Sequence, residues 1–262
     1  MNKQERQLLD SLKELKETCG VIAIKAEFEA EGARMDELIS LRELVVRADL
    51  GFVIKIGGCE AVHDMNQARL LGATGIMAPM IETPFAMRKF ASAAKRVYGV
   101  DIDSVEWIIN AETKTCLSNY QTILEEGEGF LNAVTVGRSD LSASMGIERK
   151  DIESQAVFEA TKEMLEMSKK VGCKTNFGGN IGIESIPFII GMKDIADRFE
   201  TRKVVISMDN EEKRLKKVIA RALHFELLYL LNKKSYYTRL SQEDEARIER
   251  MQMQLEKVKN YE

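Results

Sequence analysis

Two acidic residues, Glu112 and Asp140, stand where two short apolar segments of the sequence end. These segments, residues 105–113 and 131–140, are consecutive predicted strands. Because neighbouring parallel strands lie about 4.8 Å apart, carboxylates at matching heights on them can share one ion. Carboxylate, water and substrate oxygens are the ligands that Mg²⁺ or Mn²⁺ prefers. The spacing therefore predicts an open metal site here, with a pair of solvated or helix-capping acids as the alternative interpretation.

Short apolar segments alternate with amphipathic segments along most of the chain. The apolar segments are residues 21–28, 52–58, 74–82, 105–113, 131–140, 173–182 and 202–209. Strict alternation of this kind predicts parallel strands joined by right-handed helical crossovers. Residues 53–56 are continuous in apolar character apart from Lys55, as expected for a strand that is covered on both faces. The sequence thus predicts an α/β fold, either an open sheet or a closed barrel.

The barrel is favoured because polar residues recur at the same end of the predicted strands. They are Lys25, Glu27, Lys55, Glu82, Glu112, Asp140, Asn176 and Asp209. In a (β/α)8 barrel the carboxyl ends of the strands meet on one face, where the active site is built. No Gly-x-Gly-x-x-Gly segment opens a helix after the first strand, which disfavours a dinucleotide-binding sheet. We therefore predict a TIM (β/α)8-type barrel.

Composition and charge exclude several function classes. The 262 residues are 45% apolar and 31% charged, which is typical of a soluble globular protein. With 38 basic and 42 acidic residues the formal net charge is −4, so neither a nucleic-acid nor a membrane partner is indicated. The four cysteines form no Cys-x-x-Cys pair, which argues against a zinc site. Residues 1–19 contain no continuous apolar stretch, and we expect a cytoplasmic protein without a secretory signal.

Three segments resemble the HpcH/HpaI aldolase and citrate lyase β-subunit family. They are WIINAETKTCLSNYQTIL at 107–124, LNAVTVGRSDLSASMG at 131–146 and GATGIMAPMIETPFA at 72–86. The Asp-Leu-Ser-Ala sequence that begins at Asp140 is the most specific of these features. The similarity extends from about residue 9 to residue 225.

The resemblance implies a metal-dependent carbon–carbon lyase on a (β/α)8 barrel, with Glu112 and Asp140 binding Mg²⁺ or Mn²⁺. The ion would stabilise the enolate of a pyruvate- or oxaloacetate-like 2-oxoacid, with an aldehyde as the second substrate. Two alternatives remain open. One is an acyl-CoA lyase of the citrate lyase β or malyl-CoA type, and the other is a barrel that binds an oxoacid or a protein partner without turnover.

Positive charge beside the enolate oxygen is the second requirement of this chemistry. The family usually supplies it from an arginine on the strand that here reads FVIKIGG, where this sequence has Lys55. Because lysine lacks the bidentate fork of arginine, we expect Lys55 and Arg138 to divide the binding of the substrate carboxylate and enolate oxygen. Gly137 and Ser139 of the same loop are expected to contact the substrate. The alternatives are that Arg138 points to solvent and that Lys55 forms a Schiff base.

The general base is the least certain assignment in the sequence. Aldolases of this family have a histidine shortly after the first predicted strand, and the matching residue here is Phe28. Glu27 matches a family carboxylate position and is our candidate for the acid or base, with a metal-bound water as another option. Surface acidity of Glu27 and Glu29 is the alternative interpretation.

Both ends of the chain depart from the family pattern. Because the sequence begins with a predicted helix, we expect the barrel to lack the usual first strand and to have either seven strands with a gap or closure by the segment DRFETRK at 197–203. We predict a barrel domain at 1–230 and a charged helical extension at 231–262, with a capping box that begins at Ser241. Uncovered strand edges favour a homo-oligomer, in which the extension lies on a neighbouring subunit or in solvent.

Overall fold

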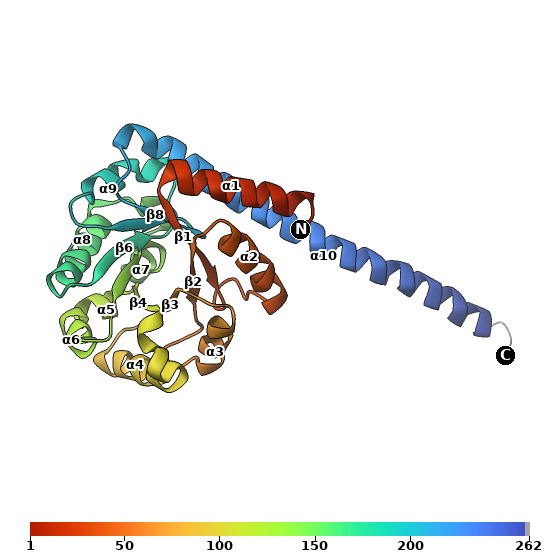
Figure 1. The fold of residues 1–262 in the computed structure, drawn as a ribbon, viewed down its shortest axis with the longest axis horizontal. Helices are drawn as coiled ribbons and strands as arrows, with labels where there is room; N and C mark the ends of the chain where they lie inside the picture. The colour runs from red at the N-terminus through yellow and green to blue at the C-terminus, as the bar shows by residue number, and fades with distance from the viewer. Residues whose placement is uncertain (260–262) are drawn as a thin grey trace.

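Within residues 1–259, which the computed structural model describes, eight strands close into a barrel in chain order (Figure 1). They are β1 (Val21–Glu27), β2 (Gly51–Lys55), β3 (Gly75–Ala78), β4 (Glu106–Ala111), β5 (Ala133–Gly137), β6 (Lys174–Gly178), β7 (Arg198–Glu200) and β8 (Val204–Ser207). Strands β1 to β7 pair in parallel, whereas β8 is antiparallel to both of its neighbours. The predicted TIM-type barrel is confirmed, with one strand reversed.

Helices cover the outside of this barrel (Figure 1). They are α1 (Lys3–Cys19), α2 (Met35–Arg47), α3 (Val62–Leu70), α4 (Pro84–Tyr98), α5 (Lys114–Ser118), α6 (Tyr120–Glu126), α7 (Arg138–Ser144), α8 (Gln155–Lys170), α9 (Ile186–Gly191) and α10 (Glu212–Lys259). Three 3₁₀ turns accompany them, η1 (Gly99–Ser104), η2 (Arg149–Asp151) and η3 (Ile183–Ser185). Local signals set their starts: the Thr83 side chain accepts a hydrogen bond from the Ala86 N–H, and Pro84 opens α4. No helix in the described part of the chain is long and apolar enough to cross a membrane.

The interior of the barrel changes from apolar to polar along the strands. A small core inside it consists of Ala23, Val53, Met77, Ile108, Ala133 and Val205, and a much larger core lies between the strands and the helices. Because side chains alternate between the two faces of a strand, the residues two positions further on also point inward. Those residues are Lys25, Lys55, Asn110 and Thr135. The carboxyl ends of the strands therefore surround a polar interior.

The segment 197–203 closes the barrel, and the alternative with seven strands and a gap is wrong. It forms β7 and then a tight hairpin into β8, in which the Thr201 N–H donates to the Val204 carbonyl at 3.0 Å. Because β8 runs in reverse, Asp209 lies at the amino-terminal end of the barrel, next to Asn210, whose side chain donates to the Cys19 carbonyl at 3.0 Å. The expectation that Asp209 lies at the same end of the barrel as the other polar residues is therefore wrong.

Helix α10 is a single helix from Glu212 to Lys259 that packs beside α1 and then projects past the barrel (Figure 1). Its barrel-facing residues are Leu215, Val218, Ile219, Ala222, Phe225 and Tyr229. Amphipathic spacing would also place Leu223, Leu227 and Leu230 against the barrel, but these side chains are 41%, 53% and 57% exposed. The boundary placed after residue 230 falls within this helix, and no new helix begins at Ser241. Residues 260–262 of the predicted extension lie outside the described residues.

Candidate active site

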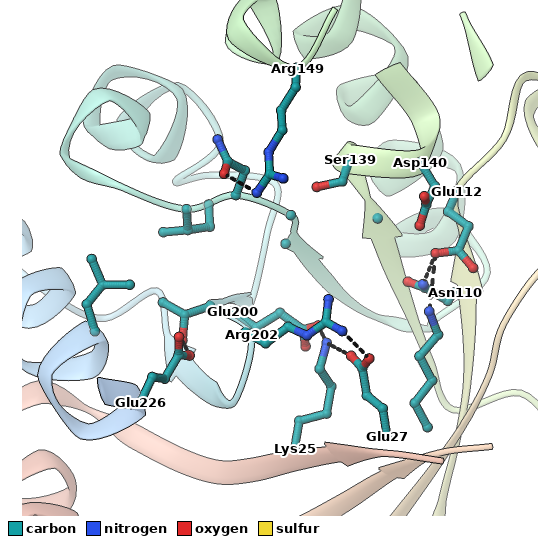
Figure 2. A pocket seen from close by; sticks show the side chains of 18 residues that line it. Lys25, Glu27, Asn110, Glu112, Ser139, Asp140, Arg149, Glu200, Arg202 and Glu226 are labelled. Carbon is teal, nitrogen blue, oxygen red and sulfur yellow. Dashed lines mark hydrogen bonds and ion pairs between the residues drawn. The ribbon is translucent and has the colours of Figure 1, made fainter. Parts of the chain in front are cut away.

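A cavity of about 300 Å³ opens at the carboxyl ends of the parallel strands (Figure 2). One side, which we call the β4–β5 wall, consists of Asn110, Glu112, Ser139 and Asp140. The other side, the β1–β7 wall, consists of Lys25, Glu27, Glu200 and Arg202. Arg149, Leu223 and Glu226 lie at the rim, and Lys55 lies between the walls. The size is that of a small-molecule site.

Glu112 is the most buried carboxylate of the β4–β5 wall, at 1% exposure. Its Oε1 accepts a hydrogen bond from the Met80 N–H at 3.1 Å, and its Oε2 accepts one from the Asn110 amide. Burial raises the pKa of Glu112 to about 7, Asp140 and Glu29 add to this rise, and Lys55 and the Met80 N–H oppose it. Met80, which the sequence did not single out, has a left-handed backbone with φ of 52°.

Asp140 lies beside Glu112 on the same side of the cavity, as Figure 2 shows. It stands in the first turn of α7 and is exposed to solvent. Gly137 makes room for this arrangement, because a Cβ there would lie 2.8 Å from Glu112 Oε2 and 3.2 Å from the Asn110 amide nitrogen. The structure thus brings Glu112 and Asp140 together as the sequence predicted, and Gly137 contributes space beside them.

The oxygen donors of Glu112 and Asp140 fit a hard divalent cation. Mg²⁺ is usually held by one or two carboxylates, and substrate and water supply its other ligands. Within residues 1–259, no group of three or more His, Cys, Asp or Glu residues is placed to hold a metal ion. Glu112 and Asp140 alone would form an open site, in which substrate and water complete the ligands.

Lys55 lies between carboxylates that follow different strands, Glu29 after β1 and Glu112 after β4. Its Nζ lies 2.9 Å from Glu29 Oε2 and 3.5 Å from Glu112 Oε2, and the side chain is buried. Burial alone would lower the pKa of Lys55, but Glu112, Glu29 and Glu27 together raise it. A Schiff-base lysine needs the opposite, a lowered pKa. The geometry therefore favours a permanently cationic Lys55 over the Schiff-base alternative.

Arg138 does not reach the cavity, and it does not point to solvent. Gly137 faces the barrel interior, so the next side chain points outward, and Arg138 is 0% exposed. Its guanidinium donates to the Gly178 and Gly179 carbonyls at 3.2 and 2.8 Å and pairs with Glu153 at 2.8 Å. The predicted substrate contact of Arg138 is therefore wrong. Its side chain lies outside the cavity and binds the backbone carbonyls at the end of β6 and in the loop that follows.

Ser139 lines the cavity as expected, at the start of α7 (Figure 2). Its backbone lies against Gly179, where a Cβ would come within 2.6 Å of the Ser139 nitrogen. Gly179 has φ of 93°, a conformation that glycine adopts without strain. This close contact joins the loop after β6 to the loop after β5.

Glu27 is buried in the β1–β7 wall at 4% exposure, so it is no surface acid. Its Oε1 lies 3.4 Å from Lys25 Nζ, and its Oε2 lies 3.1 Å from an Arg202 Nη. Lys25 also donates to Glu200, whose other oxygen accepts from the Asn176 amide at 2.6 Å. Figure 2 shows this group of side chains facing the cavity opposite Glu112.

The sequence did not assign site roles to Lys25, Glu200 or Arg202. Lys25 was recognisable as a polar residue at a strand end, but Glu200 and Arg202 lie in a segment that reads as irregular. The signal that could have found them is the short segment Arg-Phe-Glu at 198–200, which forms a strand and is followed by Thr-Arg-Lys. The end of this strand lies beside the ends of the other parallel strands. Phe28 stands where the histidine was expected, and its ring packs against the large core.

Comparisons with known proteins agree with this architecture. A family model described as HpcH/HpaI aldolase/citrate lyase matches residues 41–176, which include Glu112 and Asp140. The solved HpcH/HpaI aldolase from Desulfitobacterium hafniense DCB-2 has a TM-score of 0.60 and 14% identity, over 82% of this chain and 87% of that chain. An HpcH/HpaI aldolase/citrate lyase family protein from Burkholderia cenocepacia J2315 has a TM-score of 0.61 and 16% identity, over 91% and 100%.

A third solved structure, the citrate synthase SbnG, has a TM-score of 0.57 and 13% identity, over 84% of this chain and 88% of that chain. At identities this low, the likeness to solved structures shows a shared fold only. No curated protein matches the sequence.

Proposed function

Because this chain belongs to the HpcH/HpaI aldolase/citrate lyase family, we propose that it is a metal-dependent carbon–carbon lyase. Its substrate would be a pyruvate- or oxaloacetate-like 2-oxoacid that reacts through an enolate. The observation that carries the proposal is the pair Glu112 and Asp140, which consecutive strands bring to one wall of a cavity beside a cationic lysine.

Mg²⁺ or Mn²⁺ held by Glu112 and Asp140 would polarise the 2-oxo group when bound. The Asn110 amide and the Met80 N–H fix the orientation of the Glu112 carboxylate. The Lys55 ammonium ion, 3.5 Å from Glu112, would oppose the negative charge that develops on the enolate oxygen.

Glu27 is the group that we assign to proton transfer. In cleavage of a 4-hydroxy-2-oxoacid, the bond between C3 and C4 breaks and its electron pair stays on the enolate. The C4 hydroxyl loses its proton as the aldehyde forms, and the enolate gains one at C3. Glu27 lines the cavity, and its Oε2 forms an ion pair with Arg202 at 3.1 Å but no hydrogen bond within the described residues, so we assign it the hydroxyl proton.

Exchange of the pyruvate methyl hydrogens for deuterium tests this function without any knowledge of the second substrate. We expect NMR to show exchange that depends on Mn²⁺ or Mg²⁺ and stops when EDTA is added, because enolate formation needs the ion. Pyruvate binding without exchange, at any metal concentration, would contradict the proposal and favour the binding barrel without turnover.

A further inference from the structure

The part of α10 that projects past the barrel carries apolar side chains in an exposed position (Figure 1). Residues 241–254 are all exposed, and among them Ile248 and Met251 are 54% and 60% exposed. A helix in a protein gains most of its stability from packing an apolar face against something else. Apolar side chains at regular spacing on a projecting helix therefore indicate a partner.

The exposed apolar residues of α10 belong to one stripe along the helix, which we call the α10 seam. Its residues are spaced alternately four and three positions apart, and they are Leu223, Leu227, Leu230, Lys234, Tyr237, Ser241, Asp244, Ile248 and Met251. This spacing is the repeat of a two-stranded coiled coil. The residues that face the barrel, such as Phe225 and Tyr229, lie outside the seam. The helix therefore has a second contact face in addition to the one that packs on the barrel.

The apolar residues of the seam match each other when two copies of the helix lie antiparallel. With a two-fold axis beside residue 239, Leu230 lies opposite the partner's Ile248, and Leu227 lies opposite the partner's Met251. The symmetry repeats both contacts on the other side of the axis, so the same surface of each copy meets itself. Each apolar group beside the barrel thus covers one on the projecting end of the other copy.

The charges in the seam decide its orientation. In the antiparallel pair, Lys234 of each copy lies opposite the partner's Asp244, so opposite charges meet twice. A parallel pair would place Lys234 opposite the same lysine and Asp244 opposite the same aspartate, and like charges that face each other across an interface disfavour binding. Among the described residues, Asp244 has one ion-pair partner, Arg247 at 4.0 Å, and Lys234 has none. Both groups are therefore available to a second copy.

The same charges fix the register of the antiparallel pair. A shift by seven residues in one direction places Asp244 opposite the partner's Leu227, and a shift in the other direction places Lys234 opposite the partner's Met251. Either shift puts a charge against an apolar side chain, which costs binding free energy. The register centred on residue 239 avoids this cost.

We propose that α10 is a dimerisation helix, through which a second copy of this chain binds antiparallel along the α10 seam. The ion pairs between Lys234 and Asp244 set the orientation and register of the two helices. Leu240, which is 43% exposed, lies close to the two-fold axis in this arrangement and meets its own copy. Because each helix projects away from its own barrel, the two barrels stand at opposite ends of the helix pair.

Charge reversal with rescue tests this pairing. Lys234→Asp and Asp244→Lys each place like charges opposite each other, so we expect either variant to raise the dimer dissociation constant by about 100-fold or more. The double variant restores opposite charges and should return the constant to within about 3-fold of the wild type. Sedimentation velocity over a range of protein concentrations measures these constants. Both side chains are exposed, so the variants leave the packing of the single chain intact.

Glu243→Lys is the matched control, because Glu243 is exposed and precedes Asp244 in the sequence but lies outside the seam. We expect this variant to keep the dissociation constant of the wild type. A wild-type protein that stays monomeric would overturn the proposal. An oligomer that neither single reversal weakens would also overturn it, because the chains would then associate through another surface.

Spin-label distances check the orientation independently. Arg250→Cys, in a Cys59→Ser background because the other three cysteines are buried, gives one accessible site per chain. At the helical rise of 1.5 Å per residue, the antiparallel register separates the two labels by about 30 Å along the helices. A parallel pair would place the labels side by side, and that result would overturn the antiparallel arrangement.

Discussion

Each wall of the cavity holds a buried carboxylate for which a glycine makes room. In the β4–β5 wall, a Cβ on Gly137 would lie 2.8 Å from Glu112 Oε2, and in the β1–β7 wall, a Cβ on Gly178 would lie 2.6 Å from Glu200 Cγ. The two carboxylates differ in their partners. Glu200 is neutralised by Lys25, whereas Glu112 has Lys55 only at 3.5 Å and lies beside a second carboxylate.

The two walls therefore differ in how far their carboxylates are balanced by basic side chains. The two carboxylates of the β4–β5 wall have little positive protein charge to balance them, so this wall favours binding of a cation. In the β1–β7 wall, Lys25 and Arg202 already pair with Glu200 and Glu27. We therefore assign the metal ion to the β4–β5 wall.

The largest expected effect comes from the β4–β5 wall. Glu112→Gln keeps the size and hydrogen-bonding shape of the side chain and removes its charge, so kcat/KM should fall by about 1,000-fold, because the variant loses a metal ligand. Calorimetry with Mn²⁺ should show a matching loss of affinity. Glu82→Gln is a suitable control, because Glu82 follows β3 but does not line the cavity. Unchanged Mn²⁺ affinity in Glu112→Gln would contradict the assignment of the metal ion to the β4–β5 wall.

The next prediction concerns Arg138, whose side chain supports a segment that contacts both walls. Its guanidinium holds the loop that follows β6, and this loop touches both Ser139 and Glu200. Arg138→Met should lower the free energy of unfolding by about 3 kcal/mol, because it leaves buried polar groups unpaired. Urea denaturation measures this. The exposed pair of Arg34 and Asp36 offers a control, since Arg34→Met should change stability by less than about 0.5 kcal/mol.

Equal losses in those two variants would show that Arg138 is no structural support. A loss confined to kcat/KM, with urea stability unchanged, would instead return Arg138 to the role of a substrate ligand that the sequence suggested.

The smallest effect concerns Glu106, which ties β4 to β7 at the opposite end of the barrel through Arg198. Burial raises the pKa of Glu106, but Arg198 and Lys174 outweigh it and lower the pKa below its usual value of 4.5. The stability that results is present above about pH 4.5 and is lost as the pH falls through the lower, folded-state pKa.

Glu106→Gln should therefore be less stable than the wild type by about 1 kcal/mol at pH 7, and the difference should shrink below pH 4.5. Thermal unfolding followed at several pH values measures it. A difference that stays constant down to pH 3 would contradict this origin of the stability.

The β4–β5 wall was predictable from sequence because regular strands build it. Alternating strands and helices fixed the parallel order, and Glu112 and Asp140 then followed from their positions at strand ends. The orientation of Arg138 could also have been predicted, since the two-residue period of a strand turns it outward once Gly137 faces inward.

The β1–β7 wall was less predictable because its geometry depends on the reversed strand β8. A short apolar strand such as residues 204–207 reads the same in either direction, so neither the hairpin nor the place of Asp209 followed from the sequence. The expected homo-oligomer stays a prediction.

A crystal structure of the protein with Mn²⁺ and oxalate, a mimic of the pyruvate enolate, would show whether Glu112 and Asp140 hold the metal ion. We expect anomalous density for one Mn²⁺ bound by Glu112 and Asp140, chelated by oxalate on the side that faces Lys55. Manganese bound elsewhere, or oxalate held without an ion while the two carboxylates point apart, would contradict the proposed metal site.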